Sequence, residues 1–266
     1  MSIIDLLSQY GEKIAVVELY GTIGRQIKSS QYEQLLSKLK KDTTTRAIVL
    51  DIDSPGGGVS ESDYLYRSIL KIAESKPVIA SIRGLGASGA YYIACACTAI
   101  VAAPSSIIGS IGVISVRPAL QELLQRTGIG VRVNKSGKFK DMGAFWRDSS
   151  VEEEEKMQSL IDESYESFVE IVSQARGMEK ERVKELATGE VFWASKAHQL
   201  GLVDGIGDLD YSIDIAAKIA DAPRRPVVMR PQRSIFQTLV NPAAALLVDS
   251  VIDTIESRIA DNRIKY

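Results

Sequence analysis

The sequence contains a single histidine, His198, among its 266 residues. A Ser-His-Asp catalytic triad needs an imidazole as its general base, so a triad of that kind would have to use this one side chain. His198 lies in the stretch ASKAHQLGLVD at 194–204, whose periodicity predicts a short helix. A solvated histidine on the surface of that helix is the simplest interpretation, and the chain offers little material for imidazole chemistry.

Cysteine is almost as scarce, with only Cys95 and Cys97 in the whole chain. The two residues lie in an apolar run, 91–97, that is predicted to be helical, so their side chains point in different directions and cannot form an ordinary disulfide. We expect both to pack in the core. Neither a metal site nor a cofactor is implied by them.

The chain also lacks an excess of charge of one sign and a long hydrophobic run. Its 32 basic and 34 acidic side chains are well mixed and sum to a net charge of -2, which gives no broad positive field for nucleic acid. No segment approaches the ~20 uninterrupted apolar residues of a membrane span, and residues 1–21 have no basic N-terminal region. We expect that the protein is not an integral membrane protein, unless an anchor lies outside this sequence.

Apolar runs and amphipathic segments alternate through the first half of the chain, and the 45% hydrophobic content of the whole sequence suffices for a full-sized core. This alternation predicts an α/β fold with a largely parallel sheet covered on both faces, and repeated ββα units would also fit. We expect Tyr64, Ile69 and Ile72 to face inward. The expected strands are 14–20, 47–52, 78–82, 99–102 and 131–134; the expected helices are 31–41, 60–75 and one that starts at Ser88; the expected turns are DSPGGG at 53–58 and GLGAS at 84–88.

The second half is more helical. Ser149 and Ser150 precede four glutamates, 152–155, and then apolar residues at helical spacing as far as Val172. This pattern predicts a capped amphipathic helix that ends at Gly177, in which the glutamates complement the helix dipole and need no further function. Two short helices, 180–188 and 195–200, and a turn-rich segment that leads into another helix should follow.

The composition changes after Ala222, where PRRPVVMRPQR is rich in proline and arginine. We predict one domain over residues 1–222, and over 223–266 a linker or extended arm followed by an amphipathic tail helix at 234–259. Because acidic residues interrupt its apolar face, this tail helix is predicted to form oligomers or bind a partner rather than anchor the chain in a membrane.

Two short motifs carry the candidate chemistry. Ser88 lies in GASGAYY, and Lys140 lies 52 residues later in KSGKFKDM. A lysine can deprotonate a serine only when the amine is neutral, so its pKa would have to fall from about 10.4 toward 7 or 8 by desolvation and hydrogen bonding. Ser110, in GSIGV, is the best candidate for a hydroxyl that orients the amine. Apolar side chains suited to wall such a pocket follow the lysine or precede it: Phe139, Met142, Phe145 and Trp146.

Glycine-rich turns offer backbone N–H groups to a developing oxyanion. The glycines that follow the strand 47–52 are one source, with Gly56 and Gly57 as the candidates, and the amide of Gly89 beside Ser88 is another. A helix that starts at Ser88 would also direct the positive end of its dipole toward that charge. The GGG run differs from a phosphate-binding loop because neither GKS nor GKT follows it.

Together these segments resemble the signal peptide peptidase A family of serine-lysine peptidases, a branch of the Clp protease and crotonase superfamily. The segments that carry the resemblance are 51–62, 81–94, 103–114, 135–142, 153–177 and 189–207. The resemblance implies a Clp/crotonase-like fold of repeated ββα units with a helical second half. It also implies Ser88 as nucleophile, Lys140 as general base, Ser110 as the hydroxyl that binds the lysine, and Gly89 with Gly56 or Gly57 as oxyanion donors.

The resemblance further implies an assembly and a substrate. Similar proteins build a dome-shaped homo-oligomeric ring of eight subunits, with the serine and the lysine of one site supplied by neighbouring chains. They cleave remnant signal peptides or unfolded chains and use no metal or cofactor. The family's usual membrane-spanning segment is missing from this sequence, which leaves open a soluble or cytoplasmic protein and a membrane-associated one.

Two other functions remain open. A crotonase-like enzyme would use the same oxyanion scaffold on acyl-coenzyme A thioesters and would need a carboxylate acid-base, for which Asp51 and Asp53 are the available residues. Both precede the glycine turn and are better placed to shape it. A ring scaffold with an idle site is the third interpretation.

Overall fold

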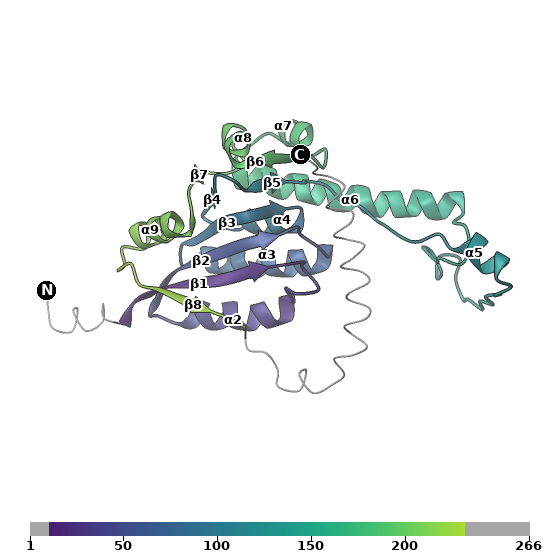
Figure 1. The fold of residues 1–266 in the computed structure, drawn as a ribbon, viewed down its shortest axis with the longest axis horizontal. Coiled ribbons are helices and arrows are strands. Elements are labelled where there is room, and N and C mark those ends of the chain that lie inside the picture. The colour runs from purple at the N-terminus through teal and green to yellow at the C-terminus, as the bar shows by residue number, and fades with distance from the viewer. Residues whose placement is uncertain (1–10, 232–266) are drawn as a thin grey trace, which may run out of the picture. The chain divides into compact units, whose positions relative to one another are not determined.

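The computed structural model describes residues 11–231, most of which form an eight-stranded sheet flanked by helices (Figure 1). The sheet order is β6-β5-β3-β2-β1-β8, with β4 pairing β3 and β7 pairing β4. The strands are β1 (Lys13–Tyr20), β2 (Thr45–Ser54), β3 (Val78–Ala87), β4 (Ala99–Ala102), β5 (Ile107–Gly109), β6 (Val191–Trp193), β7 (Gly205–Ile206) and β8 (Pro226–Met229). The helices are α2 (Ser29–Lys41), α3 (Val59–Ala73), α4 (Gly89–Ala94), α5 (Gln121–Arg126), α6 (Val151–Arg176), α7 (Lys180–Leu186), α8 (Ala194–Gln199) and α9 (Leu209–Ile219).

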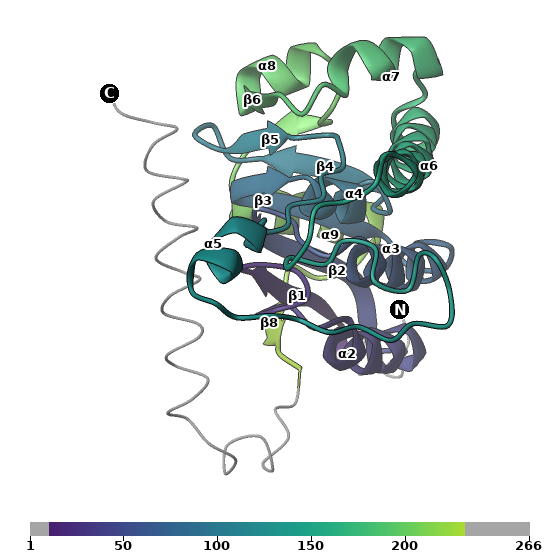
Figure 2. The ribbon, with the colours of Figure 1, turned by 90° about the vertical axis from the view of Figure 1, so that its right-hand side faces the viewer.

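The central strands are apolar throughout because helices cover both faces of the sheet. Ala15 and Val17 of β1 join a core shared with α2, α3 and α4, whereas Ile14 and Val16 join a second core shared with α9. Every strand pair is parallel except β5 with β6. In Figure 2, α7 and α8 lie together at the end of the sheet formed by β5 and β6. The predicted α/β class is therefore confirmed.

Several local predictions are wrong. The GLGAS segment is not a turn, because β3 continues to Ala87 and its last residues pair with β2 and β5. Tyr64 points outward and is 58% exposed, since the buried face of α3 runs through Leu65, Ile69 and Ile72. Residues 131–134 are not a strand and have no neighbouring strand among the described residues.

The proline- and arginine-rich segment after Ala222 contains β8, which adds to the edge of the sheet by pairing in parallel with β1. The compact unit accordingly runs to Arg230, beyond the predicted boundary at residue 222. The predicted tail helix at 234–259 lies outside the described residues. Within the described part of the chain, no helix is both long and apolar enough to span a membrane.

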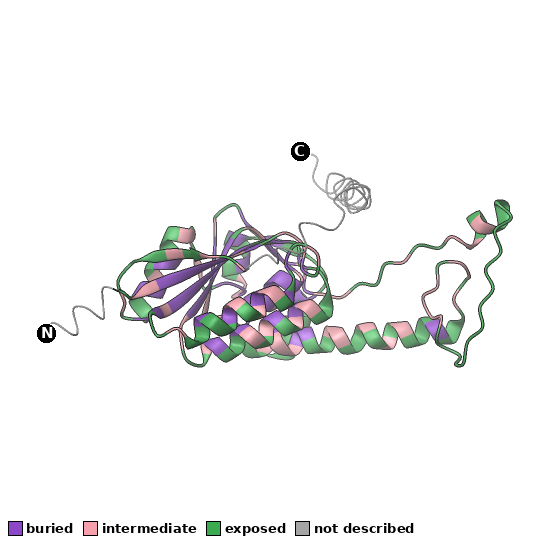
Figure 3. Cartoon of the chain, turned by 90° about the horizontal axis from the view of Figure 1, so that it is seen from below, coloured by how far each residue is buried: buried purple, intermediate pink, exposed green. Residues whose placement is uncertain are grey.

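Residues 112–150, here called the arm, leave the sheet after β5 and return as α6. Ser150 caps α6 in a capping box with Glu153, and Gly177 ends it with φ 60°, as the sequence predicts. Only the C-terminal half of α6 packs on the sheet domain, through Phe168, Val169 and Val172. The N-terminal half extends past the sheet, and the arm lies at its far end (Figures 1 and 3).

Candidate active site

Ser88 occupies a sharp turn between β3 and α4. Its backbone has φ 52° and ψ -123°, a conformation that residues other than glycine rarely adopt. The turn is held from both sides, because the Ser88 N–H donates to the carbonyl of Gly109 (2.8 Å) and the Ser88 carbonyl accepts from the Tyr92 N–H (3.0 Å). A strained residue that its surroundings hold in place, half-buried at the start of a helix, is a typical setting for a catalytic nucleophile.

The glycine turn at 56–58 lies directly against Ser88. A Cβ atom on Gly56 would stand 2.6 Å from the Gly89 nitrogen and 2.9 Å from the Ser88 Cβ, so no side chain fits there. The turn is fixed by Ile23, whose N–H donates to the Gly56 carbonyl (2.8 Å) and whose carbonyl accepts from the Gly58 N–H (3.0 Å).

The amides of Gly56 and Gly57 differ in their partners. The Gly56 N–H donates to Ser54 Oγ (3.1 Å). None of the hydrogen bonds within residues 11–231 involves the N–H of Gly57 or that of Gly89, which is the first residue of α4. These two amides are neighbours, since the Gly57 nitrogen lies 3.4 Å from the position of a Cβ on Gly89. Two unsatisfied donors therefore lie together beside Ser88.

Ser110 leaves the strand next to that of Ser88. Ala87 of β3 pairs with Gly109 of β5, so the two serines each follow one member of this pair. Ser110 also has a positive φ, 49°, and its N–H donates to the Glu190 carbonyl (2.7 Å). The structure thus brings together Ser88, Ser110 and the predicted oxyanion glycines.

Lys140 is not part of this group within one chain. It is an exposed residue in a turn of the arm, where its N–H donates to the Gly137 carbonyl (3.2 Å). The ion pairs that tie the arm to the helix reach the first turn of α6, at Glu153, about 22 Å along the helix from Phe168, where α6 packs on the sheet domain. The arm therefore holds Lys140 away from Ser88 of the same chain.

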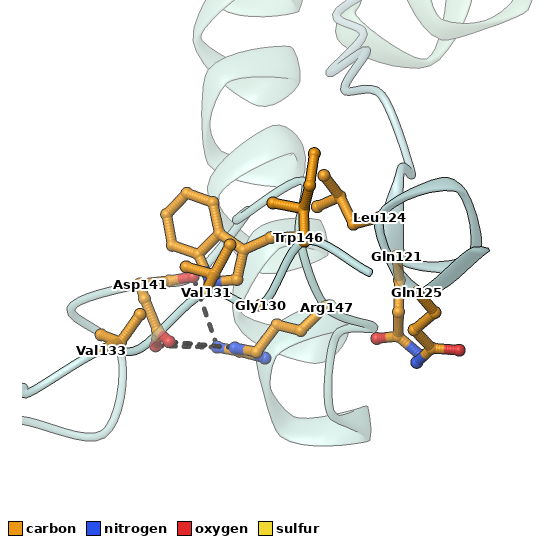
Figure 4. A pocket seen from close by; sticks show the side chains of 10 residues that line it. Gln121, Leu124, Gln125, Gly130, Val131, Val133, Asp141, Trp146 and Arg147 are labelled. Carbon is orange, nitrogen blue, oxygen red and sulfur yellow. Dashed lines mark hydrogen bonds and ion pairs between the residues drawn. The ribbon is translucent and has the colours of Figure 1, made fainter. Parts of the chain in front are cut away.

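Of the apolar residues expected around Lys140, Phe145 and Trp146 contact each other within the arm, although Phe139 and Phe145 are 44% and 42% exposed. Phe145 and Trp146 meet edge to face with ring centroids 5.0 Å apart. Trp146 also lines a cavity of about 300 Å³ with Leu124, Ile129 and Val131 (Figure 4). In a single chain they do not enclose the lysine.

The glutamates at the start of α6 do more than complement the helix dipole. Glu152 pairs with Lys138, Glu153 with Arg147, and Glu154 with Arg117. Hydrogen bonds from Arg147 and from the Ser150 N–H lower the pKa of Glu153 to about 2. These ion pairs are structural, and the basic residues of the arm were the signal in the sequence that could have indicated them.

The remaining candidate residues, Asp51, Asp53 and His198, lie outside the group around Ser88. Asp51 is 1% exposed and accepts hydrogen bonds from the Tyr20 hydroxyl and from Arg83 (2.5 Å). Burial, and secondarily this hydrogen bond to Asp51, raises the pKa of Tyr20. Asp53 accepts from the Leu85 N–H (2.9 Å), and His198 is exposed on α8. The Asp51 carboxylate is thus buried and engaged by two side chains, and that of Asp53 binds the backbone of β3.

Both cysteines are free thiols, as expected. Cys95 is 6% exposed in the core, and burial raises its pKa to about 12. Cys97 packs partly buried against the same core. Among the described residues, no group of three or more histidine, cysteine or acidic side chains is arranged to hold a metal ion.

Comparison with known proteins decides the family. Residues 71–222 match Peptidase family S49, and residues 3–108 match the Clp protease family. The chain belongs to peptidase family S49. It is 38% identical over 209 residues to a relative from Synechocystis sp.. The aligned residues make up 79% of this chain and 75% of that relative. It is also 33% identical over 223 residues to the chloroplastic serine protease SPPA of Arabidopsis thaliana. That alignment covers 80% of this chain and 33% of the longer SPPA protein.

Solved structures support the same fold. A 1510-N membrane-bound stomatin-specific protease superimposes with a TM-score of 0.52 at 16% identity, covering 84% of this chain and 99% of that one. ClpP1 from Listeria monocytogenes superimposes with a TM-score of 0.50 at 16% identity, covering 77% and 96%. The predicted Clp/crotonase-like fold, the family resemblance and the peptidase class of this S49 chain are confirmed.

Proposed function

We propose that this S49 peptidase is a serine endopeptidase in which Ser88 is the nucleophile and Lys140 the general base. Its substrates would be remnant signal peptides or unfolded chains, cleaved through an acyl-enzyme. The observation that carries the proposal is the strained Ser88 turn, beside which the free amides of Gly57 and Gly89 lie. This combination provides a nucleophile and an oxyanion site in one place.

In the proposed reaction, the Ser88 hydroxyl attacks the scissile carbonyl carbon and its proton passes to the Lys140 amine. The carbonyl oxygen becomes an oxyanion that accepts hydrogen bonds from the N–H groups of Gly57 and Gly89. The Lys140 ammonium then gives its proton to the leaving amine, and the C–N bond breaks. Water, deprotonated by the same lysine, then attacks the acyl carbon; the bond from that carbon to Ser88 Oγ breaks, and the lysine returns the proton to Oγ. Gly57 rather than Gly56 is the second donor, because the Gly56 amide is already used by Ser54.

The lysine that serves each Ser88 comes from a neighbouring subunit in this proposal. Two observations support this arrangement: α6 holds the arm away from the same chain's serine, and Lys140 is exposed in the single chain. An amine can act as a base only when it is uncharged, so the neighbour's surface would have to exclude water from it. Ser110 lies where it could bind the incoming amine.

The arm itself presents apolar surface for such an assembly. Eight of its large apolar side chains are between 42% and 85% exposed, which is unusual for a protein that acts as a monomer. These residues are Ile114, Val116, Leu123, Ile129, Val131, Val133, Phe139 and Phe145. A ring of eight subunits, as the family resemblance implies, would cover them.

Complementation between two inactive variants tests the proposal. Ser88→Ala and Lys140→Ala should each lose peptidase activity, and Lys140→Ala should also reduce the labelling of Ser88 by a fluorophosphonate to a slow residual rate. Co-expression of the two variants should restore about a quarter of the wild-type activity, because that share of randomly mixed sites pairs an intact serine with an intact lysine. Ser110→Ala should lower the rate without changing the assembly.

Three results would contradict the proposal. A stable monomer with full activity would exclude a site shared between subunits, and so would co-expressed variants that stay inactive. An acyl-coenzyme A enzyme or an idle scaffold would leave Ser88 unlabelled in the wild-type protein. Mass measurement of each sample shows which assembly was assayed.

A further inference from the structure

Arg147 ties the loop that carries Lys140 to α6, beside the ion pair that Lys138 of the same loop makes with Glu152. Arg147 donates to both carboxylate oxygens of Asp141, the residue after Lys140, at 2.8 Å and 3.0 Å. It also donates to both oxygens of Glu153 in the first turn of α6, at 2.5 Å and 2.8 Å. Figure 4 shows the Asp141–Arg147 part of this network. A guanidinium that bridges two carboxylates holds them in a defined geometry, which a flexible ammonium does not.

Both carboxylates are shielded from solvent. The side chain of Asp141 is 9% exposed and that of Glu153 is 4% exposed, in an arm whose other residues are mostly exposed. Lys135 also pairs with Asp141 (2.7 Å), from the opposite end of the same loop. The network therefore differs from an ordinary surface ion pair, which contributes little.

The position of Glu153 is in turn determined by the helix end. Its side chain accepts from the Ser150 N–H (2.9 Å), while the Ser150 hydroxyl accepts from the Glu153 N–H (3.3 Å). This capping box fixes Glu153 to the start of α6. A continuous set of hydrogen bonds thus leads from the helix, through Glu153 and Arg147, to Asp141, which follows Lys140 directly in the chain.

We infer that Arg147 is a positioning residue for the proposed base, acting with Asp141 and Glu153 to set where the Lys140 amine is presented to the neighbouring subunit. The inference rests on the proposed function, since it assigns Arg147 a role only through Lys140. In this proposal Arg147 acts through Lys140 and not by contact with the substrate. Positioning is worth much in catalysis, because a misplacement of about 1 Å can lower a rate 100-fold.

Substitutions of Arg147 test the inference. Arg147→Gln removes the charge and most of the bridge, whereas Arg147→Lys keeps the charge and loses the forked geometry. Both should lower kcat by about 10- to 100-fold while KM changes little, with Arg147→Lys the milder. The matched control is Arg126→Gln, because Arg126 is an exposed arginine of the same arm whose one ion pair among residues 11–231 is with Glu122 (3.3 Å), and it should keep the wild-type kcat.

A double variant that also lacks Lys140 tests whether Arg147 acts through the lysine. In Lys140→Ala, adding Arg147→Gln should cause no further fall in the slow rate at which a fluorophosphonate labels Ser88, because Arg147 acts through the missing amine. A further fall would overturn the inference. So would a wild-type kcat in Arg147→Gln, or a loss of oligomer mass that parallels the loss of activity in both Arg147 variants. Full activity in Lys140→Ala alone would instead refute the proposed function.

Discussion

Replacing Gly56 by alanine should damage the fold and the chemistry together. The added methyl would stand 2.6 Å from the Gly89 nitrogen, 2.8 Å from the Ala87 carbonyl oxygen and 2.9 Å from the Ser88 Cβ, all closer than van der Waals contact allows. Gly56 also has φ 94°, which alanine adopts only at a cost of about 1–2 kcal/mol. Overpacking of this kind adds about 1–3 kcal/mol.

The two terms together lower the free energy of unfolding by about 2–5 kcal/mol, which corresponds to a melting temperature lower by roughly 10 °C for a unit of this size. Gly177→Ala is the matched control, because Gly177 has φ 60° but no atom within 4 Å of the added methyl. It should therefore show only the conformational cost, a shift of a few degrees.

The chemical effect is measured by the rate at which a fluorophosphonate labels Ser88, at a temperature where every variant is folded. The methyl would obstruct one of the two proposed oxyanion donors, so the rate should fall about 100-fold or more in Gly56→Ala. Gly177→Ala should label at the wild-type rate. Equal melting temperatures and equal labelling rates for the two variants would refute the placement of the glycine turn against Ser88.

Three further predictions concern the arm, the helix end and the core. The pKa of Glu153 is lowered to about 2 from a usual 4.5, so the contribution of Glu153 to stability is complete above pH 4.5 and is lost as the pH falls toward 2. The fluorescence of Trp146, measured in a Trp193→Phe background, should report release of the arm in that pH range. An unchanged fluorescence would contradict the network. Ser150→Ala should destabilise α6 by about 1 kcal/mol, seen as a melting temperature lower by about 2–4 °C, and an unchanged value would show that the capping box contributes nothing. Cys95, whose pKa burial raises to about 12, should resist alkylation at pH 8 until the protein unfolds, so rapid modification of the native protein would be inconsistent with its packing.

Features that depend on neighbouring residues could be predicted from the sequence. The strands of the sheet centre and the helices α2, α3 and α9 follow from hydrophobic periodicity, and the ends of α6 follow from Ser150 and Gly177. The glycine turn at 56–58 and the helix that begins after Ser88 could be predicted in the same way, because both depend on the local residues.

Features that depend on distant partners could not be predicted in this way. β8 is a strand because it finds the free edge of β1, more than 200 residues earlier in the chain. The GLGAS segment extends β3 instead of turning because β2 and β5 lie alongside it. The energy of strand pairing comes from the neighbouring strand, so the local propensity of a segment does not predict it.

The candidate site, too, has features that depend on local residues and features that depend on distant partners. The sequence by itself determined the family, the α/β class and the residue types available for catalysis, since these depend on motifs that a chain carries wherever it folds. Only the tertiary structure decided that the Gly57 amide is free while that of Gly56 is bound to Ser54, and that α6 holds Lys140 away from Ser88 of its own chain. Hydrogen-bond partners and the direction of a 26-residue helix are properties of the packed molecule, and the spacing of residues along the chain does not encode them.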